Sequence, residues 1–438
     1  MPEWTIKNAA LAAFFAAGTA QVFAVEWRPE LQVQGRYSQQ EYNASSAISP
    51  RRFSSASHAV AEADVLFSPK VIVDQNIQGF LGTVAGWQSA GGGESHQLRL
   101  LEAGASFNND QQTERFTVGK VKVRWSQDSV FHPLDLFGRY NQPKSSLGVN
   151  EFDDFKKEGN VMARWQSIGD ILSYELLLAK AENNVSMPAS YQAAWRGAVQ
   201  RGESEFSLIA EKSANYNPRW GAGLSQGIGE QWTLYGEYLL SRDRDIPILQ
   251  QARPEIPVAP ATELPMLYEY RRDETQRNWQ KLLLTLRYYP QVGGSVEGSL
   301  FYNGHGLEQH EWSQWESQQL LAAETLTDPR LRPYLSGGNP YIPMLGDSAY
   351  LMQDFYLRRF YASVRIDSLE RFTQGRLEMS MIFGLEDGSS SLWMAGHYPL
   401  NEKLLVKPYL MLQSNVRGEG MMAPLSVLFG LNITQVLL

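Results

Sequence analysis

The chain has no cysteine among its 438 residues, which excludes disulfide bonds, thiolate metal sites and a lipidated N-terminal cysteine. It also has no long apolar run in its interior. Only residues 9–25 approach the roughly 20 apolar residues that a membrane-spanning helix needs. With a mean hydropathy of −0.34, the sequence does not fit a helical membrane protein. The net charge of −8 argues against general nucleic-acid binding.

Binding motifs are missing as well. The chain has no glycine-rich phosphate loop, no dinucleotide-binding fingerprint and no cysteine–histidine ligand set. The sequence therefore predicts no cofactor.

What the chain does have is alternation between apolar and polar residues. Residues 116–125 read FTVGKVKVRW, a period of two that is typical of a β-strand with one apolar face. A long polar loop at 127–159 follows, and two further strands are joined by the tight turn 167–170. This alternation of long loops and short turns between strands is typical of an outer-membrane β-barrel.

The pattern extends through the whole chain and predicts an all-β fold, a transmembrane antiparallel up-and-down barrel of about 18 strands (16–18). Within it, Leu282, Leu284 and Leu286 are expected to face lipid, and Thr285 is expected to point into water. The predicted strands lie near 29–42, 60–74, 78–88, 96–107, 114–126, 160–167, 170–182, 190–200, 204–213, 217–226, 231–242, 277–290, 293–304, 352–367, 371–385, 390–399, 403–414 and 423–438.

The connections support the same topology. If both ends of the barrel lie in the periplasm, each odd strand leads to a long extracellular loop and each even strand to a short periplasmic turn. The long connections near 43–59, 127–159, 243–276 and 305–351 all follow odd strands. The connections after even strands are short and rich in Gly, Asn and Asp, the residues of tight turns.

The N-terminus reads as a secretory signal peptide. Residues 1–24 contain the short apolar core AALAAFFAA, followed by small residues that suit a cleavage site. Cleavage is expected before Val25, with cleavage after Ala20 as the alternative. The barrel would then occupy residues 25–438.

The signal, the alternation, the loop asymmetry and the apolar last strand together resemble the proteobacterial porin-like outer-membrane β-barrel proteins. One segment is more specific, because residues 124–140 (RWSQDSVFHPLDLFGRY) are similar to the W-G-x-x-D-x-F-x-P-x-D segment of a poorly characterised group of these barrels. Ser126 stands where that pattern has glycine. The resemblance implies a passive channel or an exporter of a hydrophilic polymer in the outer membrane of a Gram-negative bacterium.

Polar residues crowd the 127–159 loop and raise the question of catalysis. Asp128, Ser129, His132 and Asp135 are residue types of a hydrolase, which needs a nucleophile within hydrogen-bond reach of a base. Pro133 and the short spacing favour an ordered turn in which Asp and Ser bond their own backbone. The sequence therefore predicts no catalytic residue and no enzyme.

The last long loop, 305–351, begins with a polar cluster. His305, His310 and Glu311 could bind a metal, but no other ligands cluster with them, and an ordinary polar loop is favoured over a metal site. Residues 312–326 predict a short helix on or inside the mouth of the barrel. This loop and the 127–159 loop are the candidates to fold inward and narrow the pore, with mobile extracellular loops as the alternative.

The lumen-facing positions follow from the period of two, with the apolar face outward. Lys120, Lys122 and Arg124 would form a basic ladder along one strand. Their field would favour anions, unless the lumen cations pair with the inward glutamates and brace the wall. The predicted pore-lining residues are Lys120, Lys122, Arg124, Arg164, Arg196, Lys281, Arg287, Arg359, Arg365, Arg376, Lys407, Glu175, Glu237 and Glu297.

Three functions are therefore open. The first is an outer-membrane channel for small hydrophilic, anionic solutes. The second is an export conduit for a polysaccharide or other polymer that works with periplasmic partners. The third is a structural or surface-interaction barrel with a closed lumen. All three place the chain in outer-membrane lipid.

Overall fold

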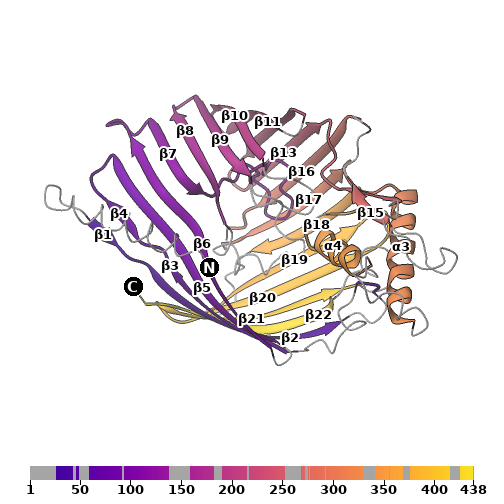
Figure 1. Cartoon of the computed structure of the whole chain (residues 1–438). Coiled ribbons are helices and arrows are strands. Elements are labelled where there is room, and N and C mark those ends of the chain that lie inside the picture. Colours follow the sequence, from indigo (N-terminus) through magenta and orange to yellow (C-terminus); the bar gives the residue numbers. More distant parts are fainter. Residues whose placement is uncertain are drawn as a thin grey trace.

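A computed structural model describes the chain over most of its length (Figure 1). The described residues are 26–42, 46–48, 59–90, 93–137, 158–181, 190–214, 217–251, 268–271, 275, 277–291, 293–328, 341–354, 356–367, 375–414 and 425–437. The predicted signal peptide, residues 1–24, lies outside this part of the chain and stays a prediction.

The described chain forms one closed antiparallel barrel of 18 strands, which confirms the predicted fold. Each strand pairs with its neighbours in sequence, and β2 closes the ring by pairing with β22 on one side and β3 on the other. The wall strands are β2 (Leu31–Tyr42), β3 (Ala59–Phe67), β5 (Ile77–Ala90), β6 (Gly93–Asn108), β7 (Glu114–Val121), β8 (Asn160–Ile168), β9 (Leu172–Ala181), β10 (Ser190–Arg201), β11 (Ser204–Ser213), β12 (Arg219–Ile228), β13 (Trp232–Ser241), β16 (Trp279–Tyr288), β17 (Ser295–Asn303), β18 (Phe360–Asp367), β19 (Arg376–Gly384), β20 (Ser390–Asn401), β21 (Leu404–Gln413) and β22 (Leu425–Val436).

Two short strands extend the wall on one side. β1 (Glu26–Arg28) pairs with β4 (Lys70–Ile72), and β4 pairs with β5. β4 continues the line of β3 after a break at residues 68–69, where Pro69 has no N–H to donate to a ladder. A separate hairpin, β14 (Ile248–Gln251) and β15 (Tyr268–Arg271), lies in the connection between β13 and β16.

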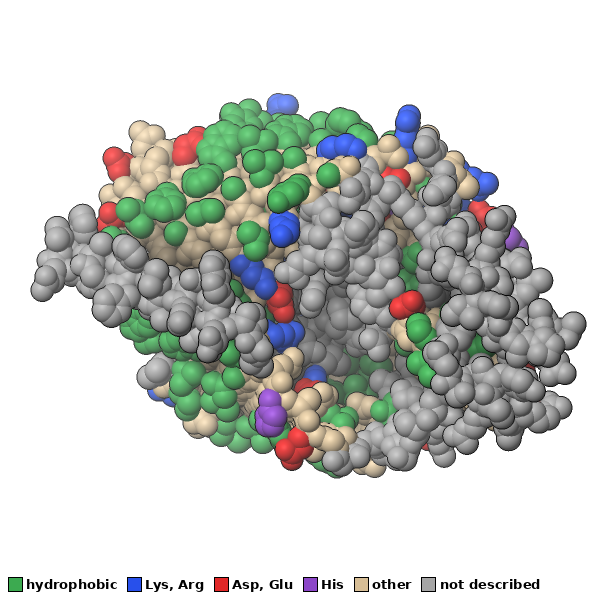
Figure 2. Space-filling view, in the orientation of Figure 1, with side chains coloured by type: hydrophobic (Ala, Val, Ile, Leu, Met, Phe, Trp, Pro, Cys, Tyr) green, Lys and Arg blue, Asp and Glu red, His purple; other side chains and the backbone are tan. Residues whose placement is uncertain are grey.

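The two faces of the wall differ in chemistry as the alternation predicts. On β16, Leu282 is 51% exposed and Leu284 is 50% exposed, whereas Leu283 and Thr285 between and beside them are fully buried. Figure 2 shows hydrophobic side chains covering the upper outer wall in this view. In a closed barrel every backbone group of the wall finds a partner, and an apolar outer face suits hydrocarbon. The leucines therefore face lipid.

Several predicted strands have different bounds, and two of them differ at the end next to a long loop. β7 ends at Val121 rather than near residue 126, because the chain turns into the lumen at Lys122. β18 begins at Phe360 rather than near residue 352. The residues before it form a helix, α4 (Tyr341–Asp354), which the sequence pattern does not predict. Pro343 lies in its first turn, where a missing N–H costs little.

The predicted helix at the mouth is confirmed as α3 (Gln309–Thr327). It begins with a capping box between Glu308 and Glu311 and ends at Thr327, two residues before Pro329. Within the described residues, neither α3 nor α4 is long and apolar enough to cross a membrane. Figure 1 shows both helices at one side of the barrel, beside β15 and β18.

Candidate functional site: a loop inside the barrel

The segment Lys122–Phe137, here called the lumen loop, leaves the end of β7 and enters the barrel. Its apolar side chains are buried: Phe131 is fully buried, and Leu134 and Phe137 are almost so. They pack against the inner side of the wall in two groups, one around β8–β13 and one around β16–β19. The prediction that the 127–159 loop folds inward is therefore confirmed for its described part.

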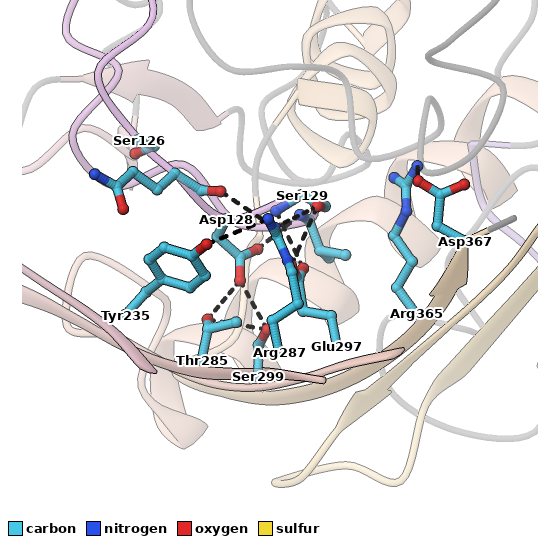
Figure 3. Close-up of polar contacts among 12 residues, drawn as sticks. Ser126, Asp128, Ser129, Tyr235, Thr285, Arg287, Glu297, Ser299, Arg365 and Asp367 are labelled. Atoms are coloured by element: carbon cyan, nitrogen blue, oxygen red, sulfur yellow. Dashed lines mark hydrogen bonds and ion pairs between the residues drawn. The ribbon is translucent and has the colours of Figure 1, made fainter. Parts of the chain in front are cut away.

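Asp128 lies at the centre of the lumen loop and is fully buried. Its Oδ1 accepts hydrogen bonds from the backbone N–H groups of Val130 and Phe131, both at 2.6 Å. Its Oδ2 accepts from the hydroxyls of Thr285 on β16 and Ser299 on β17, the latter at 2.7 Å (Figure 3). This carboxylate therefore shapes the loop and holds it to the opposite wall.

The position of Thr285 corrects one expectation. Its side chain does not point into open water, because it is fully buried beneath the lumen loop and donates to Asp128. The period of two assigns Thr285 correctly to the inner face. It cannot show what covers that face, because the covering loop is distant in sequence.

Two wall glutamates also bind the lumen loop. Glu237 on β13 accepts from the Ser126 hydroxyl and from the Gln127 backbone N–H, both at 2.7 Å. Glu297 on β17 accepts from the backbone N–H and the hydroxyl of Ser129, both at 3.2 Å. Since carboxylate hydrogen bonds to N–H and O–H groups are among the stronger ones, these contacts fix the loop across the lumen.

Arg287 on β16 completes this contact. Its guanidinium donates to Glu297, with Nε at 2.7 Å from Oε2, and to the Ser129 hydroxyl at 3.0 Å. Figure 3 shows Arg287 between the wall glutamate and the lumen loop. Its charge is thus neutralised by Glu297 and used to hold the loop.

The tip of the lumen loop enters an aromatic socket formed by Phe301, Tyr356 and Tyr361. The Phe131 ring stacks on Phe301 with centroids 4.7 Å apart, and it lies 5.0 Å from Tyr356 and 6.3 Å from Tyr361. Aromatic pairs at these distances stabilise a contact beyond the area that they bury. The tip is therefore fixed by packing as well as by hydrogen bonds.

The catalytic candidates have structural partners. The Ser129 hydroxyl bonds to Glu297 and Arg287, while His132 Nδ1 lies 3.3 Å from Arg124 and 3.9 Å from Asp135. Asp135 accepts from the backbone N–H groups of residues 125 and 126. The described contacts thus do not bring serine and histidine together, and the expected bonding of Asp128 to its own backbone is present.

Most of the predicted pore-lining residues form ion pairs in the structure. Lys122 and Arg124 lie on the lumen loop, beyond the end of β7, so the three basic residues do not form a ladder on one strand. Three wall pairs join neighbouring strands: Arg164 with Glu175, Arg196 with Glu205, and Arg287 with Glu297. A fourth, Lys407 on β21 with Glu378 on β19, reaches across β20. Pairs with loop or strand-end residues are Lys120 with Glu158, Lys122 with Glu102, Lys281 with Asp245, Arg359 with Glu308, and Arg365 with Asp367.

The remaining predicted residues have other neighbours. Arg376 begins β19 and lies opposite His397 of β20. Glu237 binds the lumen loop, as described above, and the role of all these residues in lining a pore stays a prediction.

The outer loops around α3 form a cap with a hydrophobic core of its own. This cap consists of α3, α4 and residues 46–48, Ile246 and Leu357, which pack together. At its base Arg244, almost fully buried, donates to both carboxylate oxygens of Glu311, each at 2.7 Å. The cap is therefore built from three loops that are far apart in sequence.

The suggested metal ligands lie in the cap with separate roles. His305 Nδ1 accepts a hydrogen bond from the Asp245 backbone N–H at 2.9 Å, and burial lowers the pKa of His305 to about 3. Glu311 pairs with Arg244, and the His310 side chain is exposed. Among the described residues, no group of three potential ligands lies together.

Comparison with known proteins finds the same fold without a match in sequence. No protein-family model and no curated protein matches the chain. Among solved structures, OccAB1 of Acinetobacter baumannii is 10% identical with a TM-score of 0.52, covering 94% of this chain and 96% of that chain. OccK5 (OpdH) of Pseudomonas aeruginosa is 8% identical and OccAB3 of A. baumannii 10% identical, each with a TM-score of 0.50, 94% of this chain and 99% of the other.

These similarities show the fold alone. Together with the closed wall and its lipid-facing leucines, they agree with the resemblance found in the sequence. The chain therefore has the fold of the porin-like outer-membrane β-barrels.

Proposed function

We propose that this protein is an outer-membrane channel for the passive diffusion of small hydrophilic solutes, with a preference for anions. The barrel wall is closed, and its inner face carries polar and charged side chains. The lumen loop lies across the interior of the barrel and reduces the cross-sectional area that is open to solutes. A loop in this place suits small solutes, since it limits the size of what passes.

The observation that carries the anion preference is the unequal exposure of charges around the lumen loop. The acids that hold the loop, Asp128, Glu237 and Glu297, are buried at 0%, 4% and 2% exposure. By contrast, the Arg124 side chain is 46% exposed, although it donates to the loop carbonyl oxygens of Ser126 and Asp128 and its Nε lies 4.0 Å from the Asp135 carboxylate. An exposed cation beside buried acids favours anions, because the low-dielectric wall focuses its field on the water column.

The wall away from the lumen loop adds little to this preference. Arg164 pairs with Glu175 at 2.8 Å and Arg196 pairs with Glu205 at 2.8 Å, so each cation is offset by a neighbouring acid. These pairs support the bracing interpretation for that part of the wall. The proposed selectivity is therefore local to the narrow part of the channel.

The export of a polymer is less well supported. A polymer conduit needs a continuous wide bore, whereas the lumen loop is held to β13, β16 and β17 by buried hydrogen bonds. Moving it aside would leave buried carboxylates without partners, which costs free energy.

The test is a planar-bilayer recording of the purified, refolded protein under a salt gradient. We expect the reversal potential to show a preference for chloride. The variant Arg124→Gln should weaken that preference, and Lys122→Gln should add a smaller effect because Lys122 lies 3.6 Å from Glu102. Arg201→Gln is the control, since this exposed residue is the last of β10, next to the turn that leads to β11. A barrel without conductance would favour the closed, structural alternative, and a preference for cations would contradict the anionic one.

A further inference from the structure

The aromatic socket that receives the tip of the lumen loop is connected to the cap. Tyr356 and Tyr361 lie on either side of Arg358, and Leu357 belongs to the core of the cap. The Tyr361 hydroxyl accepts a hydrogen bond from the Arg358 backbone N–H at 2.6 Å. The same short segment therefore contributes to the socket inside the barrel and to the cap outside it.

The Arg358 side chain binds this segment to α3. It is 1% exposed, and its Nη2 donates to Gln309 Oε1 at 2.7 Å. Its guanidinium carbon lies 5.2 Å from the centre of the Trp312 ring, which stacks on Trp315. A buried arginine with a hydrogen bond on one side and an aromatic ring on another favours one arrangement of its neighbours.

Arg358 is also bound to the barrel rim. Its Nε lies 3.5 Å from Glu386 and 3.8 Å from Asp387, both in the turn between β19 and β20. Helix α3, this turn and the segment 356–361 therefore all contact Arg358.

From these contacts we infer that Arg358 is a positioning residue for the narrow part of the channel. It holds Tyr356 and Tyr361 so that they receive Phe131, and thereby couples the cap outside the barrel to the lumen loop inside it. The coupling passes through direct contacts, from Gln309 and Trp312 through Arg358 and Tyr361 to Phe131. A disturbance of the cap would therefore loosen the lumen loop, although no residue of the cap helices lies in that loop.

The first test measures the lumen loop without requiring conductance. In detergent, hydrogen exchange of the amides of residues 124–137 is compared between wild type and Arg358→Ala. We expect about tenfold faster exchange at Val130 and Phe131, since contacting residues couple by amounts of this size. Exchange in β9–β12, far from Arg358, should not change. Unchanged exchange in the lumen loop would overturn the inference.

A second variant separates the coupling from a general loss of the cap. Tyr361→Phe keeps the ring for Phe131 but removes the hydroxyl that accepts from Arg358, so it should also speed exchange in the lumen loop. Tyr361→Phe also tests the coupling if Arg358→Ala does not fold into a barrel. Arg277→Ala is the matched control, because it removes an exposed arginine just before β16. Equal exchange in Tyr361→Phe and Arg277→Ala would contradict the proposed link.

A third test, which measures single-channel currents, rests on the proposed function as a channel. If the wild type conducts, Arg358→Ala and Phe131→Ala should each raise the rate of subconductance transitions about tenfold, and the double variant should add little more. Additive effects would mean that the two residues act separately. A silent wild type would contradict the proposed channel but not the coupling, which the exchange measurement decides independently.

Discussion

The Asp128 carboxylate of the lumen loop accepts a hydrogen bond at 2.7 Å from the Ser299 hydroxyl on the opposite wall, 171 residues further along the chain. The same oxygen accepts from Thr285. A single acid thus joins the loop after β7 to strands β16 and β17.

Replacing Asp128 should therefore widen the channel and weaken the fold. Asp128→Ala removes bonds to Val130, Phe131, Thr285 and Ser299 and leaves buried donors unpaired. We expect a loss on the order of 3 kcal/mol in the free energy of unfolding in urea. The single-channel conductance should rise at the same time.

The control for this change is Asp170→Ala, which removes an exposed acid from the turn between β8 and β9. It should leave both stability and conductance unchanged. A wild-type conductance in Asp128→Ala would show that the loop is held in place without this residue.

Arginine should lower the free energy of unfolding at two neighbouring positions of β16, for different reasons. Leu284→Arg places a charge on the lipid face and should cost about 2–4 kcal/mol near the midplane. Thr285→Arg places a long cation under the lumen loop, where no space is open, and overpacking alone costs about 1–3 kcal/mol. Folding titrations in lipid vesicles measure both. Thr285→Ser, which keeps the hydroxyl, should be nearly neutral, and a fully tolerated Thr285→Arg would place Thr285 in open water.

The cap should weaken in acid through Glu311. Burial acts to raise the pKa of Glu311, but the hydrogen bonds and charge of Arg244 outweigh it and hold the pKa below the ordinary 4.5. A depressed pKa gives stability that is present above the unfolded-state value and is lost as the pH falls through the folded-state value.

The measurement is protease cleavage within α3 as the pH is lowered below 4.5. Cleavage should increase in the wild type. Glu311→Gln should be cleaved more readily at neutral pH and should show a smaller pH dependence. An identical pH dependence in both proteins would assign the acid sensitivity to a group other than Glu311.

The N-terminus offers a further prediction. If residues 1–24 are a signal peptide, protein isolated from outer membranes begins at Val25 or close to it. Intact-mass measurement decides this directly. A mass that includes Met1 would remove the main sequence argument for secretion.

The faces of the strands, and most of their lengths, were predictable because they depend on neighbours in sequence. The alternation around Leu284 and Thr285 assigned lipid and inner faces correctly, and the long connections followed the odd strands. The local hydrogen bonds of Asp128 to Val130 and Phe131 were also predictable from the sequence. An Asp side chain often accepts from the backbone N–H groups two or three residues further along the chain.

The contents of the lumen were decided by tertiary structure alone. Asp128 and Thr285 are 157 residues apart, and no periodicity relates them. The basic ladder failed for a similar reason: the alternation continues past Val121, but packing of the lumen loop inside the barrel draws Lys122 and Arg124 out of the wall. Alternation in sequence fixes which way a strand side chain points, whereas burial and pairing depend on which distant segment the closed barrel brings against it.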